Sequence, residues 1–322
     1  LLNEITPEYH FQNSKKTMPT EQEIRLQKTI DALIESYSEH PEIEHIGTID
    51  LPAKENIVTL VEDIQVLLFP GLIRQESFDY LNLPHVVGQH TVSILYRLKE
   101  AIEMVLCWKA TEEGKRCEEL PEFGEQVENI AFEFLEYLPE LRDILSDDVD
   151  AILRGDPASV SKREIVLAYP GLQAVSVFRI AHFLHLRGVP LIPRIMTEHV
   201  HSKTGIDIHP GVTIGKGLMI DHGTGIVIGE TTIIKDQVRI YQGVTLGALS
   251  PQHSLANPGL KRHPAIENNV IVYSGATILG DVVIGEGSII GGNVWLTHST
   301  EPHSRVFLKD ADSALEVRVK AV

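Results

Sequence analysis

Hydrophobic residues in the first 200 positions follow the three-to-four spacing of amphipathic helices. One such helix is predicted over 20–38, and Thr20 with Glu23 has the form of a capping box at its start. Further helical patterns cover 53–69, 90–111, 124–138, 140–154, 172–187 and 191–201. Prolines lie between them, where helices begin or end. This pattern indicates a surface for packing and oligomerisation rather than chemistry.

A different period begins at Ile208, where an aliphatic or β-branched residue recurs every six positions. The first run comprises Ile208, Ile214, Ile220, Ile226, Thr232, Val238 and Val244. After an interruption, a second run in a new phase extends from Ile266 to Leu296. Gly, Asn or Asp fills most fourth positions of these units, and such residues best tolerate the positive φ of a chain corner.

A short strand and a corner every six residues predict a three-sided coil of about eighteen residues. Successive coils would stack as parallel strands about 4.8 Å apart. The predicted fold class is α+β, with an N-terminal α-helical domain over 1–203, a parallel β-helix over 204–305 and a C-terminal tail over 306–322. Residues 250–265 interrupt the period, so they are expected to leave the wall as an extruded loop, where function tends to concentrate.

Composition and charge narrow the class of protein. The chain has 322 residues, 43% of them hydrophobic, as in ordinary globular proteins. Its net charge of −17 argues against nucleic-acid or anionic-membrane partners. No apolar stretch is long enough to span a membrane, and the first twenty residues lack a signal-peptide core. Cys107 and Cys117 are too few for a disulfide framework and match no zinc spacing, which favours a reducing cytoplasm.

Candidate chemistry gathers at a few ionisable residues within the coils. Asp207 lies fifteen residues before His222, close to one coil, so the two side chains could be neighbours. A carboxylate beside an imidazole raises its basicity and fixes its tautomer, which produces a general base. A histidine at a corner can equally be a hydrogen-bonded structural residue. Asp221 precedes His222, and the extruded loop adds Arg262 and His263.

Several segments together resemble a known enzyme family. They are 154–158, 169–174, 205–210, 218–231 with its run Asp-His-Gly-Thr-Gly, and the loop exit Arg262-His263-Pro264. In this order they resemble the serine O-acetyltransferases, left-handed β-helix enzymes of the hexapeptide-repeat acyltransferase superfamily. The resemblance implies transfer of an acetyl group from acetyl-CoA to the hydroxyl of L-serine, giving O-acetyl-L-serine for cysteine biosynthesis.

The resemblance also implies roles for individual residues. Its catalytic residues would be His222 as the general base, Asp207 orienting it, and His263 helping the site to close. The substrate-binding residues would be Asp156 and Asp221 on the ammonium group and Arg262 on the carboxylate. Small residues that would let acetyl-CoA approach are Gly247, Ala248 and Ala276. No metal is expected.

In this superfamily, the active site forms between neighbouring β-helices of a trimer. The resemblance therefore implies a homotrimer or a dimer of trimers. A complex with cysteine synthase stays open, because the chain ends in Val322 where the family often has isoleucine.

Three other readings remain at this point. The same scaffold also carries O-acetyltransferases that act on sugar or xenobiotic hydroxyls. His298 and His303 have a spacing suggestive of the γ-class carbonic anhydrases, although His222 would lie more than three coils away, too far to share their zinc ion. The third reading is a non-catalytic scaffold whose loop binds a partner.

Overall fold

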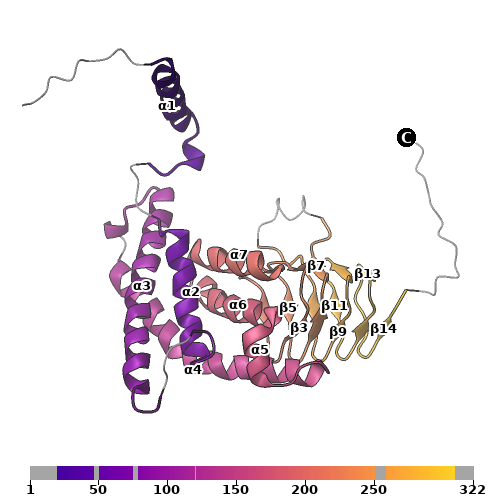
Figure 1. The fold of residues 1–322 in the computed structure, drawn as a ribbon. Helices are drawn as coiled ribbons and strands as arrows, with labels where there is room; N and C mark the ends of the chain where they lie inside the picture. Colours follow the sequence, from indigo (N-terminus) through magenta and orange to yellow (C-terminus); the bar gives the residue numbers. More distant parts are fainter. Residues whose placement is uncertain (1–19, 47–50, 75–78, 120, 251–258, 309–322) are drawn as a thin grey trace, which may run out of the picture. The chain divides into compact units, whose positions relative to one another are not determined.

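The structure is a computed structural model that describes residues 20–46, 51–74, 79–119, 121–250 and 259–308 (Figure 1). The chain divides into two compact units, Leu1–Asp50 and Leu51–Val322. The first contains the helix α1 (Glu21–Glu39) and the 3-10 turn η1 (Pro41–Ile43). The predicted capping box is confirmed, because Thr20 and Glu23 satisfy each other's backbone N–H groups.

The second unit begins with helices that pack around one apolar core. They are α2 (Lys54–Leu68), α3 (Leu83–Glu112), η2 (Cys117–Glu119), α4 (Phe123–Gly155), α5 (Lys162–Ala168), α6 (Pro170–Leu186) and α7 (Ile192–Thr204). Most agree with the predicted ranges within a few residues. The short helix α5 was not predicted, because its single buried residue, Ile165, creates no helical period.

The break predicted at Pro139 was wrong, since α4 runs through it. A proline inside a helix removes one hydrogen bond and costs roughly 3 kcal/mol. Leu138, Leu141 and Leu145 on both sides of it are buried in the same core. Burial of one continuous apolar face therefore offsets the proline.

A parallel β-solenoid of about five turns follows, as predicted (orange to yellow in Figure 1). Its strands are β1 (Ile206–Ile208), β2 (Thr213–Ile214), β3 (Met219–Asp221), β4 (Ile226–Ile228), β5 (Ile233–Ile234), β6 (Arg239–Tyr241), β7 (Thr245–Gly247), β8 (Ala265–Ile266), β9 (Ile271–Val272), β10 (Thr277–Leu279), β11 (Val283–Ile284), β12 (Ile289–Ile290), β13 (Trp295–Leu296) and β14 (Arg305–Val306). Sheet A stacks β1, β4, β7, β10 and β13; sheet B stacks β2, β5, β8 and β11; sheet C stacks β3, β6, β9, β12 and β14.

The first coil is longer than predicted. Ile206 pairs with Ile226, a coil of 20 residues, whereas Val227 pairs with Thr245 after the expected 18. The inward ladder of sheet A therefore continues from Ile208 to Ile228, two residues beyond the predicted Ile226. The predicted phase was wrong at this point because Ile226 and Ile228, two positions apart, are both buried, so burial alone does not show which of them continues the ladder. The two extra residues lie in the corner 222–225.

The loop prediction falls partly outside the described residues, namely at 251–258. The strand register still shows between which strands the inserted residues lie. Thr245 of β7 pairs with Thr277 of β10, a coil of 32 residues, so 14 residues beyond the usual 18 are accommodated between β7 and β8. Most of the predicted tail, 309–322, also lies outside the described residues.

A buried ion pair fastens the helices to the first coil. The Arg179 guanidinium on α6 donates to both carboxylate oxygens of Asp148 on α4, at 2.8 and 2.9 Å. It also donates to the carbonyl of Gly215, while the N–H of Leu218 donates to Asp148. These bonds hold the C-terminal part of α4 against the segment that leads into β3.

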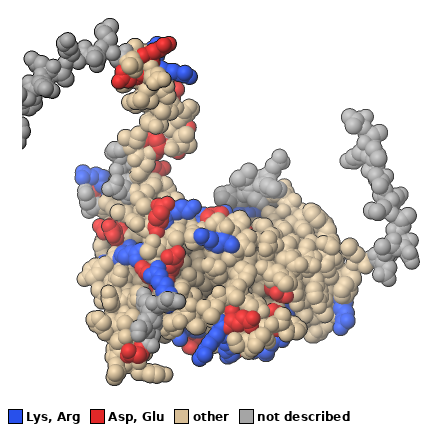
Figure 2. All heavy atoms as spheres, in the orientation of Figure 1, with Lys and Arg blue, Asp and Glu red and all other residues tan. Residues whose placement is uncertain are grey.

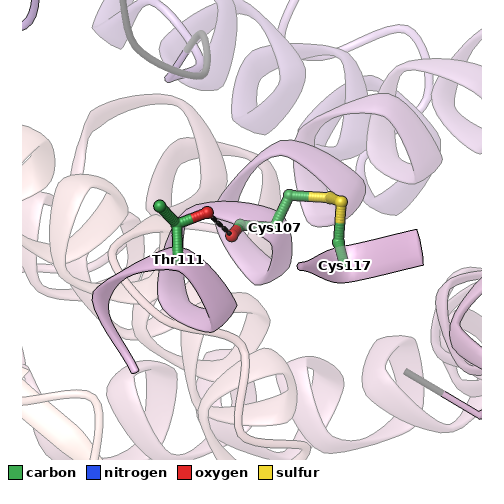
Figure 3. The surroundings of a disulfide bond; sticks show 3 residues. All are labelled: Cys107, Thr111 and Cys117. Carbon is green, nitrogen blue, oxygen red and sulfur yellow. Dashed lines mark hydrogen bonds between the residues drawn. A yellow bond between two sulfur atoms is a disulfide. The ribbon is translucent and has the colours of Figure 1, made fainter. Parts of the chain in front are cut away.

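The two cysteines differ from expectation. Cys107 and Cys117 form a disulfide that joins α3 to η2, with their Cα atoms 4.9 Å apart (Figure 3). The sequence alone gave no reason to expect a disulfide, because one pair of cysteines makes no framework. The turn after α3 reverses the chain and brings them together.

Charge is unevenly distributed over the second unit. On the face shown in Figure 2, charged side chains gather over the helices, and the last coils carry few. Among the described residues, no single helix is long and apolar enough to cross a bilayer; α5 and α6, bent by 75°, pass that test only as a pair.

Candidate active site

The enlarged corner after β3 presents His222 to solvent. His222 has φ of 55°, and Gly223 and Gly225 in the same turn also have positive φ. A side chain at positive φ is uncommon outside glycine, and such outliers concentrate at functional sites. The His222 side chain is 71% exposed, and its Nε2 lies 3.9 Å from Oδ1 of Asp221.

Asp156 faces this corner from the end of α4. Its Oδ2 accepts a 2.6 Å hydrogen bond from the Tyr169 hydroxyl, and its Oδ1 accepts one from the N–H of Ala158. These two donors, with a smaller contribution from His222, hold the pKa of Asp156 below its usual value. The same hydrogen bond raises the pKa of Tyr169 to about 12, so Tyr169 remains a donor at neutral pH.

Tyr241 completes what we call the His222 cluster: Asp156, Tyr169, Asp221, His222 and Tyr241. It pairs with Asp221 across sheet C and stacks on Tyr273 at 5.2 Å. Burial first, and then the charge of Asp221, raise the pKa of Tyr241. One chain thus brings together three of the predicted site residues, two carboxylates and an imidazole.

Replacing Tyr169 with phenylalanine should weaken binding of serine, the substrate that the family resemblance implies. The change removes the donor to Oδ2 of Asp156, so that carboxylate loses its fixed orientation and its pKa rises. We expect the KM for serine to increase a few-fold and the acid limb of its pH profile to move to higher pH, while the KM for acetyl-CoA stays constant. An unchanged serine KM and acid limb would show that Tyr169 does not position Asp156.

A second group, the Arg262 cluster, lies at the turn between sheets A and B. It comprises Glu230, Thr231, Arg262 and His263. The Arg262 guanidinium forms an ion pair with Glu230. Burial alone would raise the pKa of Glu230, but Arg262 and the nearby His209 outweigh it and lower that pKa.

The Thr231 hydroxyl anchors the exit of the extruded loop. Its Oγ1 accepts hydrogen bonds from the N–H groups of Arg262 and His263, at 3.0 and 3.1 Å. In return, the N–H of Thr231 donates to Nδ1 of His263 at 3.1 Å. When the ring is neutral, its proton must therefore reside on Nε2.

His263 itself is buried, with 7% of its surface exposed. Burial, followed by the charges of Arg262 and Lys261, lowers its pKa to about 4, so the ring is neutral at pH 7. It packs over Gly229, where an added Cβ would lie 2.1 Å from Nε2. Within one chain, the predicted catalytic residue His263 holds the end of the extruded loop against the three-sided β-solenoid, which we call the prism.

Thr231→Val and Thr231→Ser form a matched pair of tests. Valine keeps the shape but leaves two backbone N–H groups without their acceptor, whereas serine keeps the oxygen. With serine as the substrate and Arg262 as its ligand, as the resemblance implies, we expect T231V to raise the serine KM about tenfold through displacement of Arg262, and T231S to stay near wild type. Equal kinetics for both variants would contradict an anchoring role for the hydroxyl.

The two clusters occupy different corners of the prism. His222 lies in the turn from sheet C to sheet A, and Arg262 lies at the turn from sheet A to sheet B. One face of six residues separates these corners, roughly 20 Å at ~3.3 Å per residue. Among the described residues, no hydrogen bond or ion pair joins the two clusters. A single chain therefore presents two halves of the predicted site.

Asp207 lies on the outward face of β1, near the corner that carries His222. Its register partner is Val227, just beyond the 222–225 turn. The described part of the chain contains no hydrogen bond or ion pair between Asp207 and His222. Asp207 lies instead beside Glu198 and His201 of α7, with one ligand atom of each within 4.8 Å of the other two.

The predicted cofactor residues differ in accessibility. Gly247 and Ala248, at the end of β7, are partly exposed. Ala276 is completely buried inside the prism, and its N–H and C=O are both engaged in backbone hydrogen bonds. Within one chain, the Ala276 side chain is therefore not accessible to a cofactor, and its predicted role stays a prediction.

The chain is similar to known proteins along most of its length. A model of the family described as bacterial transferase hexapeptide (six repeats) matches residues 263–298. A plasmid serine acetyltransferase of Synechococcus elongatus is 41% identical over 252 residues, which are 77% of this chain and 79% of that protein. The chain belongs to the serine acetyltransferase family.

Solved structures of the family agree with this assignment. The serine acetyltransferase isoform 3 of Entamoeba histolytica, determined in complex with cysteine, is 31% identical, with a TM-score of 0.66 over 91% of this chain and 95% of that one. The serine acetyltransferase of Neisseria gonorrhoeae in complex with serine is 25% identical, with a TM-score of 0.51 over 83% of this chain and 98% of that one. The chain is thus an acyltransferase that acetylates serine, and family membership implies acetyl-CoA as its co-substrate.

The other functional readings lose their support. The sugar and xenobiotic transferases and the non-catalytic scaffold do not agree with these relatives. Within the described ranges, the one group with metal-ligand spacing contains neither His298 nor His303.

Sequence reasoning gave no role to Tyr169 or Thr231, and it singled out Glu230 only as one of the few ionisable residues within the coils. Tyr169 and the Glu230-Thr231 pair lie inside segments that carry the family resemblance, but nothing in the pattern shows which polar residues touch which ions. Their positions along the chain could have identified them, because each is a polar residue directly beside a corner of the solenoid or a helix end.

Proposed function

We propose that His222 is the general base of serine acetylation, in a site completed by the Arg262 cluster of a neighbouring copy of the chain. The observation that carries this proposal is the enlarged corner, which exposes an imidazole between two carboxylates. Such an arrangement suits an amino-acid substrate, whose ammonium group needs anions and whose carboxylate needs a cation.

The serine zwitterion would bind at the interface between two neighbouring chains, which we call the seam. Asp156 and Asp221 hold its ammonium group, and Arg262 of the next copy holds its carboxylate. These contacts place the serine hydroxyl at His222. Asp207 would orient the imidazole, and because no hydrogen bond or ion pair joins it to His222 within the described residues of one chain, this role also depends on the assembly.

The chemical step is direct transfer in a ternary complex. Nε2 of His222 takes the hydroxyl proton as the serine oxygen attacks the thioester carbonyl carbon of acetyl-CoA. The tetrahedral intermediate collapses with cleavage of the carbon–sulfur bond, and the proton on His222 passes to the departing CoA thiolate. The products are O-acetyl-L-serine and CoA, and the scheme uses no acyl-enzyme and no metal.

A homotrimer is the assembly that supports this site best. Thr231 lies one corner beyond the turn that carries His222, so the two clusters differ in height by about one coil or less, ~4.8 Å. A three-fold axis parallel to the prism would bring different corners of adjacent copies together. Their charges are complementary, with carboxylates on one side and a guanidinium on the other. We also propose that two trimers pair through their helical domains, as the family resemblance implies.

Acetyl-CoA would lie along this seam, passing Gly247 and Ala248, where small residues leave room for the pantetheine arm. A cytoplasmic location remains a prediction, and the Cys107–Cys117 disulfide removes the cysteine argument for it. A complex with cysteine synthase also remains a prediction, since the tail ending in Val322 lies outside the described residues.

The test is release of free thiol from acetyl-CoA with different acceptors. We expect L-serine to support turnover, and L-homoserine and galactosides to support at least about tenfold less, because the two charged clusters fix both the length and the charges of the acceptor. Comparable turnover with a galactoside would contradict the proposed site.

A further inference from the structure

A second constellation of ligating side chains lies where the helices join the solenoid. Glu198 and His201 are three residues apart on α7, and Asp207 follows on β1. One ligand atom from each lies within 4.8 Å of the other two, and all three residues are partly buried. We propose that these residues form a zinc-binding site.

The geometry is close to that of a zinc site. Two donor atoms about 2.1 Å from a tetrahedral zinc ion lie roughly 3.4 Å apart. Nδ1 of His201 and Oε2 of Glu198 are 3.3 Å apart. The remaining separations are no longer than 4.8 Å, so they exceed this spacing by at most about 1.4 Å. The His201 and Glu198 side chains are 40% and 42% exposed, so water can reach the fourth position.

The surroundings hold the ligands in place. Arg194, one turn earlier on α7, donates to Oε1 of Glu198 at 2.5 Å, which leaves Oε2 facing His201. Second-shell bonds of this kind orient ligating carboxylates. Arg194 is a cation in contact with one of the ligands, and the two carboxylates offset its repulsion of a divalent ion. His209, whose pKa is lowered first by burial, also lies near Asp207 and Arg194.

Asp207 gives the site a consequence for activity. The described residues contain no hydrogen bond or ion pair to its carboxylate, so it is available to a metal. Zinc bound there would withdraw Asp207 from orienting His222 and would inhibit serine acetylation. This consequence rests on the proposed role of Asp207, whereas zinc binding itself does not.

The binding test is titration of the metal-free full chain with zinc chloride by isothermal calorimetry. Wild type should bind one zinc ion per chain that His201→Gln and Glu198→Gln each weaken by more than about 100-fold, beyond the effect of losing an outer-shell partner. His199→Gln, on the same helix but outside the group, should bind as wild type does. Wild type without such a site, or variants that bind zinc as tightly as wild type, would overturn the proposal.

Two further readouts separate the possibilities. Circular dichroism of the metal-free variants should match wild type, and either glutamine variant alone decides the binding question. Zinc should inhibit wild-type serine acetylation, and inhibition should be at least about tenfold weaker in H201Q. Zinc binding at the site without inhibition would leave the metal site standing and remove Asp207 from the mechanism.

Discussion

Replacing His222 with asparagine should lower the turnover number for serine acetylation by about 10²–10⁴-fold, the usual contribution of a positioned general base. Asparagine is the appropriate replacement because it tolerates the positive φ of this corner better than alanine does. The KM values for serine and acetyl-CoA should change little, because the imidazole accepts a proton during the chemical step and does not bind the charged groups of serine.

The controls for this variant are its fold and its binding of CoA. Both should remain as in wild type, since His222 is largely exposed and stabilises no core contact. Wild-type turnover in H222N would eliminate the imidazole as the base and with it the proposed mechanism.

Replacing Arg262 with glutamine should raise the KM for serine by roughly 10- to 100-fold, the effect of losing a charge-assisted hydrogen bond. The turnover number should fall less, because the base and the ammonium-binding carboxylates remain. Arg262→Lys keeps the charge without the two-pronged geometry, so it should fall between wild type and R262Q.

The methyl ester of serine provides the matched substrate for this variant. It lacks the carboxylate charge, so wild type and R262Q should use it with nearly equal kcat/KM. If R262Q impairs both substrates equally, Arg262 does not recognise the carboxylate and acts only through loop structure.

The sequence predicts the solenoid well because each coil repeats the same physical requirement. Inward positions must be aliphatic, and corners must accept positive φ, as at Asn269, Gly275 and Asn293. From Ile226 onward, the phase of the first run was two residues off, because Ile226 and Ile228 are both buried. Periodicity alone could not reveal the enlarged corner, although that corner is what presents His222.

The candidate site was only partly predictable. Spacing along the coils indicates that Asp221 and His222 share a corner, but the approach of Asp156 depends on how α4 packs against β3, and on the buried Asp148–Arg179 pair that holds it. The sequence also suggested that Asp207 neighbours His222, whereas one chain places it beside His201. Contacts between side chains on different elements follow from packing angles that local pattern does not specify.

The central claim is that each active site combines His222 of one chain with Arg262 of another. Its most direct test is to co-express H222N and R262Q chains and to measure serine-dependent thiol release from acetyl-CoA at low serine concentration. Random assembly into trimers would restore an intact seam at about a quarter of the sites, so the mixture should recover about a quarter of wild-type activity, far above either variant alone. A mixture no more active than the average of its two components, with mixed trimers demonstrated, would contradict a shared site.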